Sequence, residues 1–219
     1  MDWSFIHKFA PMYVTAAELT LKLAVFGILL SVLIGLLCSI LQYLHVPVLR
    51  RIIGIYIELS RNTPLLVQLF FLYFGLPRLG IKLSSDACGI IGLAFLGGSY
   101  MAEAFRSGFE SVEKKQIESG LSIGLSHAQV IRYITLPMAV SRSIPAFCAN
   151  VIFLIKETSV FSAVALADLM YLAKDLIGLY YQTDETLVML VLSYLVILLP
   201  ISIASSLLER RMRYAEFGH

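Results

Sequence analysis

Residues 116–137 read QIESGLSIGLSHAQVIRYITLP, a stretch that carries the charge missing from the strongly apolar segments on either side of it. Ile117 and Leu121 are about one helical turn apart, so they share one face of a first short helix. Gly124 follows where a left-handed helix end requires a residue without a Cβ atom. The first half of this stretch therefore predicts a short helix that ends in a sharp turn.

The second half of the stretch predicts another helix. Ser126 and Gln129 have the spacing of a capping box and precede an apolar run. Pro137 has no amide hydrogen, so we expect this helix to end there or to bend into the next membrane segment. The pattern indicates a compact helix–turn–helix outside the bilayer, and spacing alone leaves an ordinary cytoplasmic loop as the alternative.

Composition places the chain among membrane proteins. Of its 219 residues 58% are hydrophobic and 15% are charged, and the mean hydropathy is +0.83. A water-soluble domain of this size could not bury so much apolar surface. A net charge of +2 does not indicate nucleic-acid binding. Cys38, Cys88 and Cys148 lie in apolar stretches, so we expect packed thiols, and the four histidines lack metal-ligand spacing.

Five apolar segments are predicted to cross the membrane as helices. They cover about residues 18–44, 52–76, 87–105, 137–155 and 186–208. The first is too long for a signal-peptide core and no basic cluster precedes it, so we expect it to remain a membrane helix. Gly97 and Gly98 are expected to allow close helix packing. Residues 160–181 are only moderately apolar and predict a short helix or a re-entrant piece.

Polar residues interrupt the second segment. Arg61 would lie roughly 15 Å beyond Arg51 along a regular helix, near the middle of the bilayer. A charge at that depth is costly, so it is expected to be paired or to face water. Glu58 is close enough on the same helix face to pair with Arg61. Pro64 breaks the hydrogen-bond ladder, which is tolerated only beside protein or a wet cavity.

The distribution of basic residues predicts which ends of the segments face the cytoplasm. One side would receive Arg50, Arg51, Arg106, Lys114, Lys115, Arg132, Arg210, Arg211 and Arg213, and the other Lys8, Arg78, Lys82, Lys156 and Lys174. The first set is larger and is expected to be cytoplasmic, with the N-terminus outside. No Gly-Lys dipeptide occurs, so a phosphate-binding P-loop is absent and the energy of ATP would have to arrive through a partner.

The opening stretch resembles the EAA loop of ABC-transporter membrane subunits, whose pattern is Glu-Ala-Ala, three residues, Gly, nine residues, Ile, one residue and Leu-Pro. The matching positions are Glu118, Ser119, Gly120, Gly124, Ile134, Leu136 and Pro137. Ser119 and Gly120 replace the two alanines, and both are small, so close docking is expected to survive. The resemblance implies that this loop docks into a groove of the ATP-hydrolysing subunit. Because they lack a side chain, Gly120 and Gly124 are expected to let the backbones of the two helices approach.

Three more stretches resemble polar amino-acid uptake permeases of the same superfamily. They are YIELSRNTPLLVQLFFLYFGLP at 56–77, SYMAEAFRSGFESV at 99–112 and NVIFLIKETSV at 150–160. Asn62 replaces the usual glycine, and Glu157 replaces an aspartate. The resemblance implies an amino-acid importer subunit of the bacterial cytoplasmic (inner) membrane.

Such a subunit pairs with itself or a paralogue, binds two ATPase subunits and receives substrate from an external binding protein. It binds no cofactor itself, because ATP and Mg²⁺ belong to the ATPase. Fold and domain follow from the same interpretation. We expect an all-α membrane protein of five transmembrane helices, with the coupling helix–turn–helix between the third and fourth. The chain 1–219 would form a single permease domain, with a coupling loop at about 111–137.

Candidate substrate-pathway residues offer a cation, donors and acceptors to a zwitterionic amino acid. They are Glu58, Arg61, Thr63, Glu103, Asn150, Lys156, Glu157 and Thr158. Structural alternatives stay open for six of these eight residues: a buried Glu58–Arg61 pair, a Glu103–Arg106 helix pair, an exposed outer loop at Lys156 and Glu157, and a backbone bond for Asn150.

Two other functions compete with the importer. The first is a secondary transporter or channel driven by an ion gradient, with Glu58, Arg61 and Glu103 as ion or proton groups. The second is a membrane-embedded enzyme, which is disfavoured because the sequence has neither His-Glu-x-x-His nor Gly-x-Ser-x-Gly.

Overall fold

The computed structural model describes residues 1–43 and 46–217, with side chains as far as Met212. Leu44, His45 and the Arg213 side chain, which entered the predictions above, lie outside the described part. Within it every regular element is helical. The elements are α1 (Trp3–Tyr43), α2 (Pro47–Arg61), α3 (Leu65–Phe70), η1 (Phe71–Gly75), η2 (Leu76–Leu79), α4 (Ser85–Glu110), α5 (Lys114–Ser122), α6 (His127–Val130), η3 (Ile131–Thr135), α7 (Leu136–Glu157), η4 (Thr158–Val164), α8 (Leu169–Tyr180) and α9 (Thr183–Phe217).

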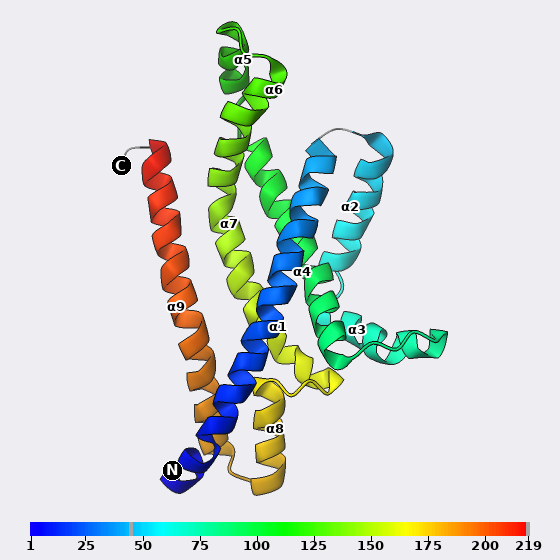
Figure 1. The fold of residues 1–219 in the computed structure, drawn as a ribbon, viewed down its shortest axis with the longest axis vertical. Coiled ribbons are helices and arrows are strands. Elements are labelled where there is room, and N and C mark those ends of the chain that lie inside the picture. Colours follow the sequence, from blue (N-terminus) through cyan, green and yellow to red (C-terminus); the bar gives the residue numbers. More distant parts are fainter. Residues whose placement is uncertain (44–45, 218–219) are drawn as a thin grey trace.

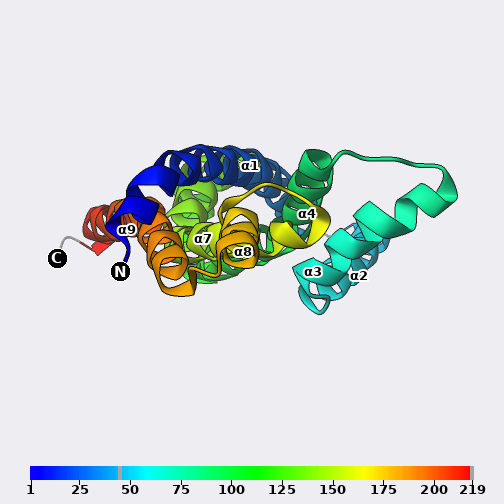
Figure 2. The same cartoon turned by 90° about the horizontal axis from the view of Figure 1, so that it is seen from below.

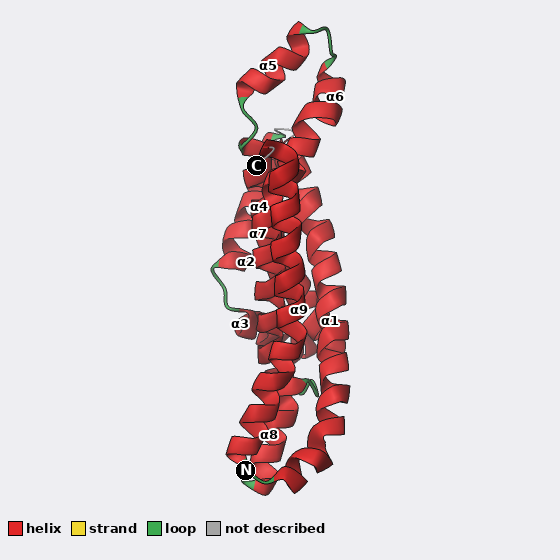
Figure 3. Cartoon of the chain, turned by 90° about the vertical axis from the view of Figure 1, so that its left-hand side faces the viewer, coloured by secondary structure: helices red, strands yellow, loops and turns green. Residues whose placement is uncertain are grey.

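The molecule is an elongated bundle built around α4, which packs against α1, α2 and α7, while α9 packs against α7 and α1. The N- and C-termini lie at opposite ends of the bundle, and α5 and α6 project beyond the end that carries the C-terminus (Figures 1 and 3). Seen along its length, α2 and α3 form an arm beside the bundle (Figure 2). Four helices in the described part are long and apolar enough to cross a membrane.

The first helix begins at Trp3, not near residue 18 as predicted. Phe5, Phe9 and Tyr13 pack with residues of α8 and α9, and this apolar cluster continues the helix past its polar positions. Tertiary packing has overridden a local pattern that ended the segment too early. With 41 residues, α1 is about 61 Å long.

Close packing at two neighbouring glycines of α4 is confirmed. A Cβ atom on Gly97 would lie 2.2 Å from Ser31 Oγ of α1, and one on Gly98 would lie 2.6 Å from the Tyr56 hydroxyl of α2. No side chain fits at either position, so α1 and α2 both approach α4 through them. In a membrane, such small contact residues replace the hydrophobic drive for helix association.

The interruption predicted within the segment 52–76 is confirmed, and it divides the segment into separate helices. The helix α2 ends at Arg61, and α3 begins at Leu65 after a break of three residues, 62–64. From this break α3 and the turns after it run sideways from the bundle (Figure 1). Pro64 is extended and precedes α3, because a proline cannot donate to the preceding turn.

Pro137 does not end the helix that contains it. The backbone stays helical from His127 through the π-helical turn η3 into α7. A π turn changes the carbonyl pairing just before the proline, where a regular α-helix would place a carbonyl against its ring. Of the two outcomes predicted at Pro137, an end or a passage into the next membrane segment, the structure therefore shows the passage, within a continuous helix.

The remaining segments follow the predictions with longer bounds. The segment predicted at 87–105 forms α4, and the one at 186–208 forms α9. The moderately apolar region 160–181 contains the short helix α8, as predicted. The three cysteines are free thiols, with Cys88 and Cys148 buried and Cys38 partly buried.

Candidate coupling and translocation sites

The projecting helix pair has the predicted turn. Gly124 adopts a left-handed φ of +88° directly after α5. The Leu125 amide donates to the Gly120 carbonyl at 3.2 Å, and the Gly124 amide donates to the Leu121 carbonyl at 3.0 Å. These two bonds form a Schellman motif, which satisfies the last carbonyls of α5. The left-handed role predicted for Gly124 is confirmed.

The capping box at the start of α6 is also confirmed. The Gln129 amide donates to Ser126 Oγ at 3.3 Å, and the Ser126 amide donates to Gln129 Oε1 at 2.8 Å. Both ends of the turn are thus closed by their own hydrogen bonds. Such closure fixes the angle between α5 and α6, so the pair is a stiff element rather than a loose loop.

The two glycines of the pair have different roles. A Cβ atom on Gly120, which is buried, would lie 2.6 Å from Ile134 Cδ1 and 3.1 Å from Val130. Gly120 therefore allows α5 to pack on α6 and η3, as expected. Nothing lies within 4 Å of a Cβ atom on Gly124. The expectation that Gly124 also lets two backbones approach is wrong, because its role is confined to the turn.

The outer surface of the pair is rich in exposed groups. Glu118, Ser119, Leu136 and Pro137 are exposed, and Ile134 is partly exposed. Ile123 at the turn is 78% exposed, although it is one of the most apolar residue types. A hollow of about 380 Å³ opens beside it, lined by Lys115, Gln116, Ser119, Gly120, Ile123, Ile134 and Met138. An exposed apolar tip with a hollow is typical of a protein interaction site.

Three predicted pathway residues meet around Tyr100 of α4. The Arg61 guanidinium lies over the Tyr100 ring, 5.2 Å from its centroid. Asn150 Nδ2 of α7 donates to the Tyr100 carbonyl at 3.1 Å. Glu103 lies one turn further along α4 and is partly exposed. The structure therefore gathers a cation, a carboxylate and an amide from three helices around one aromatic ring.

Glu103 is held by Arg106. Arg106 donates to both carboxylate oxygens of Glu103 and to Glu110 at 2.5 Å. The helix pair that sequence left open for Glu103 is thus present. The buried pair left open for Glu58 and Arg61 is wrong, because both residues are exposed and Arg61 stacks on the tyrosine instead.

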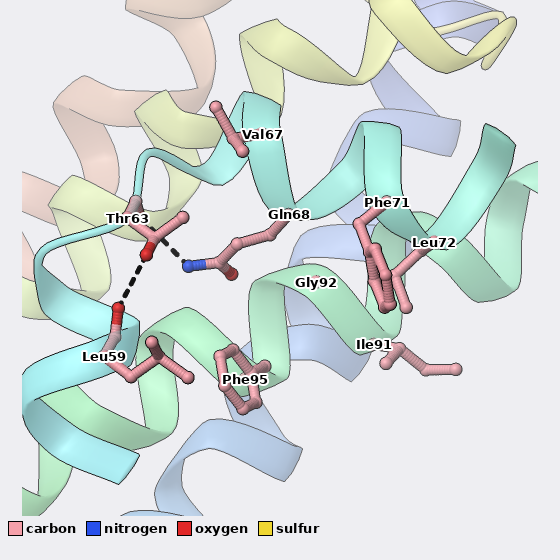
Figure 4. Close-up of a pocket in the computed structure, with 9 residues that line it drawn as sticks. All are labelled: Leu59, Thr63, Val67, Gln68, Phe71, Leu72, Ile91, Gly92 and Phe95. Carbon is pink, nitrogen blue, oxygen red and sulfur yellow. Dashed lines mark hydrogen bonds between the residues drawn. The ribbon is translucent and has the colours of Figure 1, made fainter. Parts of the chain in front are cut away.

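The break between α2 and α3 satisfies its own backbone. Side chains donate to carbonyls of the last turn of α2: Asn62 Nδ2 to Glu58 at 2.8 Å, Thr63 Oγ1 to Leu59 at 2.8 Å and Gln68 Nε2 to Ser60 at 3.1 Å. The carbonyls of Glu58 and Ser60 also accept the backbone amides of Asn62 and Thr63. Gln68 also donates to the Thr63 carbonyl at 3.0 Å (Figure 4). Asn62 has φ −92°, so a glycine is not required there. An interrupted helix at membrane depth needs such partners.

A largely apolar cavity of about 440 Å³ lies beside this break, between α3 and α4. Its lining residues are Leu59, Thr63, Val67, Gln68, Phe71, Leu72, Ile91, Gly92 and Phe95 (Figure 4). Gln68 Oε1 is buried there without a partner in the described part of the chain. Thr63 is thus the one predicted pathway residue that lines this cavity within the described structure.

The three candidates at the end of α7 have different environments. Lys156 is exposed and Glu157 is partly buried. Thr158 is fully buried, and its hydroxyl donates to the Ile155 carbonyl at 2.7 Å. These three residues are not part of the group around Tyr100. Tyr100 itself was not among the predicted pathway residues. Local spacing could not reveal Tyr100, because its contacts come from two other helices.

These features define a class: a helical membrane transport subunit with a rigid projecting pair for a partner. The family model described as "Binding-protein-dependent transport system inner membrane component" matches residues 16–214, so the chain belongs to this family. It is the permease subunit of an ABC importer, and ATP hydrolysis resides in a separate subunit. The resemblance found in the sequence is confirmed.

Curated relatives agree over most of the chain. Identity is 39% over 159 residues, 73% of each chain, with the probable glutamine ABC transporter permease protein GlnP of Bacillus subtilis. It is 31% over 214 residues with the glutamine transport system permease protein GlnP of Escherichia coli (strain K12), covering 97% of this chain and 98% of that protein.

Solved structures share the fold. A crystal structure of an amino acid ABC transporter with histidines matches with a TM-score of 0.90 and 31% identity, covering 96% of this chain and 99% of that chain. The MetNI methionine ABC transporter in an inward-facing conformation matches with a TM-score of 0.78 at 19% identity, over 97% of this chain and 99% of that chain, and this likeness shows the fold alone.

Proposed function

We propose that this permease carries a polar amino acid inward and takes its driving force through residues 111–137. The rigid pair α5–α6, with Ile123 78% exposed at its tip, is the observation that carries this proposal. The amino-acid substrate is supported by the relatives and by the structural match to an amino acid ABC transporter. The whole chain 1–219 acts as one permease domain in this proposal.

The proposed topology has five crossings, with the N-terminus outside and the C-terminus in the cytoplasm of a bacterium. The broken pair α2–α3 serves as the second crossing, beside the four long apolar helices. Support comes from charge. The start of α2 lies at the end of the bundle that carries α5 and α6 (Figure 1). Arg50 and Arg51 belong to this start, and Lys114, Lys115 and Arg132 belong to α5 and η3. Cytoplasmic segments favour such residues.

The proposed partners are two ATP-binding cassette subunits, a second permease copy or paralogue, and an extracytoplasmic substrate-binding protein. ATP and Mg²⁺ would be held by the cassette subunits. Glu118, Ser119, Gly120, Gly124, Ile134, Leu136 and Pro137 form or support the docking surface. A stiff pair suits this task because a helix transmits a displacement that a loose loop would absorb.

The substrate pathway is proposed to pass the group around Tyr100. Arg61 supplies a cation for a carboxylate, and Glu103 supplies an acceptor for an ammonium group. The Tyr100 ring under Arg61 keeps that cation in place without neutralising it. Glu58 of α2 and Thr63 of the break after α2 continue this path. Lys156 and Glu157 lie at its outer end, where the buried Thr158 supports the backbone through its bond to the Ile155 carbonyl.

Substitution of two pathway residues tests this route. We expect Glu103→Gln and Asn150→Ala to lower uptake or alter selectivity by roughly tenfold, the loss of about one charge-assisted hydrogen bond. Uptake kinetics of the reconstituted transporter measure this, with Glu110→Gln as a matched control because Glu110 shares Arg106 with Glu103. Unchanged kinetics in both pathway variants would show that the substrate passes elsewhere.

Reconstitution tests the function as a whole. The permease is placed in vesicles with and without its ATPase subunits and binding protein, and uptake of labelled amino acids is measured. Uptake should require ATP and the ATPase. An ion gradient that drives uptake by the permease alone would instead support the alternative, a secondary transporter or channel.

A further inference from the structure

A polar hollow lies among α1, α2 and α4, at the end of the bundle nearest α5 and α6. Its volume is about 390 Å³, and it is lined by Ser39, Gln42, Tyr43, Arg50, Gly54, Arg106, Phe109 and Glu110. Tyr43 stacks on Phe109 with ring centroids 5.1 Å apart, which forms one wall. This hollow is distinct from the cavity of Figure 4, and it is joined to the group around Tyr100 through Arg106, which holds Glu103.

Within the described residues, the lining contains one cationic side chain without an ion pair and one acceptor atom without a hydrogen bond. Arg50 is exposed, and no ion pair of Arg50 occurs within the described part of the chain. Arg106, by contrast, is engaged by Glu103 and Glu110. Gln42 Oε1 is buried without a hydrogen-bond partner in the described residues. A ligand that satisfies both groups needs an anionic oxygen for Arg50 and a hydroxyl or ammonium donor for Gln42.

Exposed apolar residues lie on two of the helices that form this hollow, outside the positions that line it. Leu37 and Ile40 of α1 are 61% and 38% exposed, and Ile52 and Ile55 of α2 are both 60% exposed. Acyl chains could cover these side chains while a polar headgroup occupies the hollow. The phosphodiester of a phospholipid supplies the anionic oxygen, and a glycerol headgroup supplies the hydroxyl.

We infer that this hollow binds the headgroup of an acidic phospholipid, with the phosphate on Arg50 and a headgroup hydroxyl on Gln42. The inference uses the proposed orientation, which puts the site in the cytoplasmic leaflet, where anionic lipids attract basic residues. It does not depend on the transported substrate. Free phosphate shares the anionic oxygens but brings no acyl chains.

Two variants separate the hollow from general charge attraction. Arg50→Gln and Arg51→Gln remove the same charge from neighbouring exposed positions, but only Arg50 lines the hollow. Gly54→Leu leaves charge unchanged and fills the hollow. Nothing lies within 4 Å of a Cβ atom on Gly54, so the fold has room for it. Gly178→Leu on α8 is the matched control, since Gly178 is equally open.

The permease is assembled in nanodiscs of phosphatidylcholine with a small fraction of phosphatidylglycerol, then extracted, and retained lipid is counted by native mass spectrometry. We expect Arg50→Gln to lower retained phosphatidylglycerol about tenfold, the usual effect of one charged hydrogen bond. Gly54→Leu should also lower it, because the leucine side chain occupies the space of the headgroup. Arg51→Gln and Gly178→Leu should retain it as the parent chain does. A parallel sample holds phosphatidylcholine with inorganic phosphate.

Three outcomes would overturn the inference. Equal losses of retained phosphatidylglycerol in Arg50→Gln and Arg51→Gln would show that only surface charge attracts the lipid. Full retention in Gly54→Leu would place the lipid outside the hollow. Displacement of phosphatidylglycerol by inorganic phosphate at low millimolar concentration would identify a free anion site. Because retention is measured without transport, a failure here leaves the proposed function standing, and a failed uptake assay leaves this site standing.

Discussion

In the projecting helix pair α5–α6, one residue fixes the turn without making a side-chain contact. Gly124 touches nothing that a Cβ atom would displace, yet its φ of +88° excludes most side chains. Gly80, in the loop before α4, has φ +86° and the same open surroundings. Both positions require a left-handed backbone conformation, but they lie in different parts of the molecule. A substitution at Gly80 is therefore a matched control for the same substitution at Gly124.

Gly124→Leu should cost about 1–2 kcal/mol locally, because a branched side chain is disfavoured in the left-handed region. The strain falls on the turn, so we expect ATP-driven uptake to fall while membrane insertion stays intact. Gly80→Leu carries equal strain and should leave coupling unchanged. Gly124→Asn should restore much of the activity, since asparagine tolerates this conformation. Normal ATP-driven uptake in Gly124→Leu would remove the docking role.

Asp168 is a buried carboxyl at the start of α8, outside the long membrane helices. Its Oδ1 accepts from the Tyr171 amide at 2.9 Å, and Oδ2 has no partner in the described residues. Burial raises the pKa of Asp168 to about 6, although the Tyr171 amide and Lys174 act in the opposite direction. Tyr194 of α9 is near enough to feel this charge.

The folded state therefore holds the Asp168 proton more tightly than the unfolded chain, whose aspartate pKa is about 3.9. Its contribution to stability is present below about pH 4 and is lost as the pH rises through 6. Asp168→Asn should flatten this dependence and add on the order of 1–3 kcal/mol at pH 7, because asparagine still caps the helix. Thermal unfolding in detergent between pH 4.5 and 7.5 measures this.

The control is Asp175→Asn, because Asp175 is exposed on the same helix. It should leave the pH profile of unfolding as it is in the parent chain. If the parent chain and Asp168→Asn show parallel unfolding temperatures over that range, the buried carboxyl does not titrate as described.

Residue patterns predicted local chemistry well. The capping box of Ser126 and Gln129 and the left-handed Gly124 follow from short spacing, because their partners lie within a few positions along the chain. The stacking of Arg61 on Tyr100 does not follow from spacing. It depends on how α2 crosses α4, and a rigid-body arrangement of helices leaves no local signature.

At the scale of elements, the break between α2 and α3 is held by side chains from both of its sides. Gln68 is central because it donates to two carbonyls, those of Ser60 and Thr63. In water, freed carbonyls would bond to solvent, but in a membrane they need protein partners. The break is therefore a built part of the structure rather than a weak point.

Gln68→Met keeps the length of the side chain and removes both donations. We expect it to lower the stability of the permease by about 1–3 kcal/mol, the cost of leaving buried carbonyls unsatisfied. Thermal unfolding of the detergent-solubilised chain measures the change. Gln182→Met, on a partly exposed residue before α9, should have little effect. Equal unfolding temperatures for Gln68→Met and the parent chain would mean that water reaches the break.

Element bounds were harder to predict than element existence. The polar residues His7 and Lys8 hid the first turns of α1, which pack against α8 and α9. The proline at 137 left open whether the helix ends or passes into the next membrane segment, and the π-helical turn η3 carries the helix through. In both places tertiary packing or a rare helix geometry decided the bounds, and sequence spacing measures neither.

On the scale of the whole molecule, apolar exposure has two causes. Side chains along α1 and α9 face the region that a bilayer would cover, whereas Ile123 stands on the projecting pair, beyond the other helices (Figure 3). We propose that a protein partner covers the exposed Ile123 side chain there. This contrast distinguishes a docking tip from an ordinary membrane surface.

Ile123→Ser should weaken binding of the ATPase subunit by roughly tenfold or more, since it removes an apolar side chain that fills a partner pocket. The permease itself should fold normally, because that side chain is 78% exposed. Co-purification with a tagged ATPase subunit measures binding. Ile81→Ser, on a side chain that is 52% exposed in the loop before α4, is the control. An unchanged yield of ATPase with Ile123→Ser would mean that the tip is not the contact.

The length of α1 has a consequence for whatever approaches from the N-terminal end. A helix of 41 residues is about twice as long as the roughly 30 Å hydrocarbon layer is thick. Its first turns are joined to α8 and the start of α9 by the aromatic cluster of Phe5, Phe9 and Tyr13. The three helices therefore form one packed surface at the N-terminal end of the molecule. A soluble protein that approaches from this end would contact these helices first.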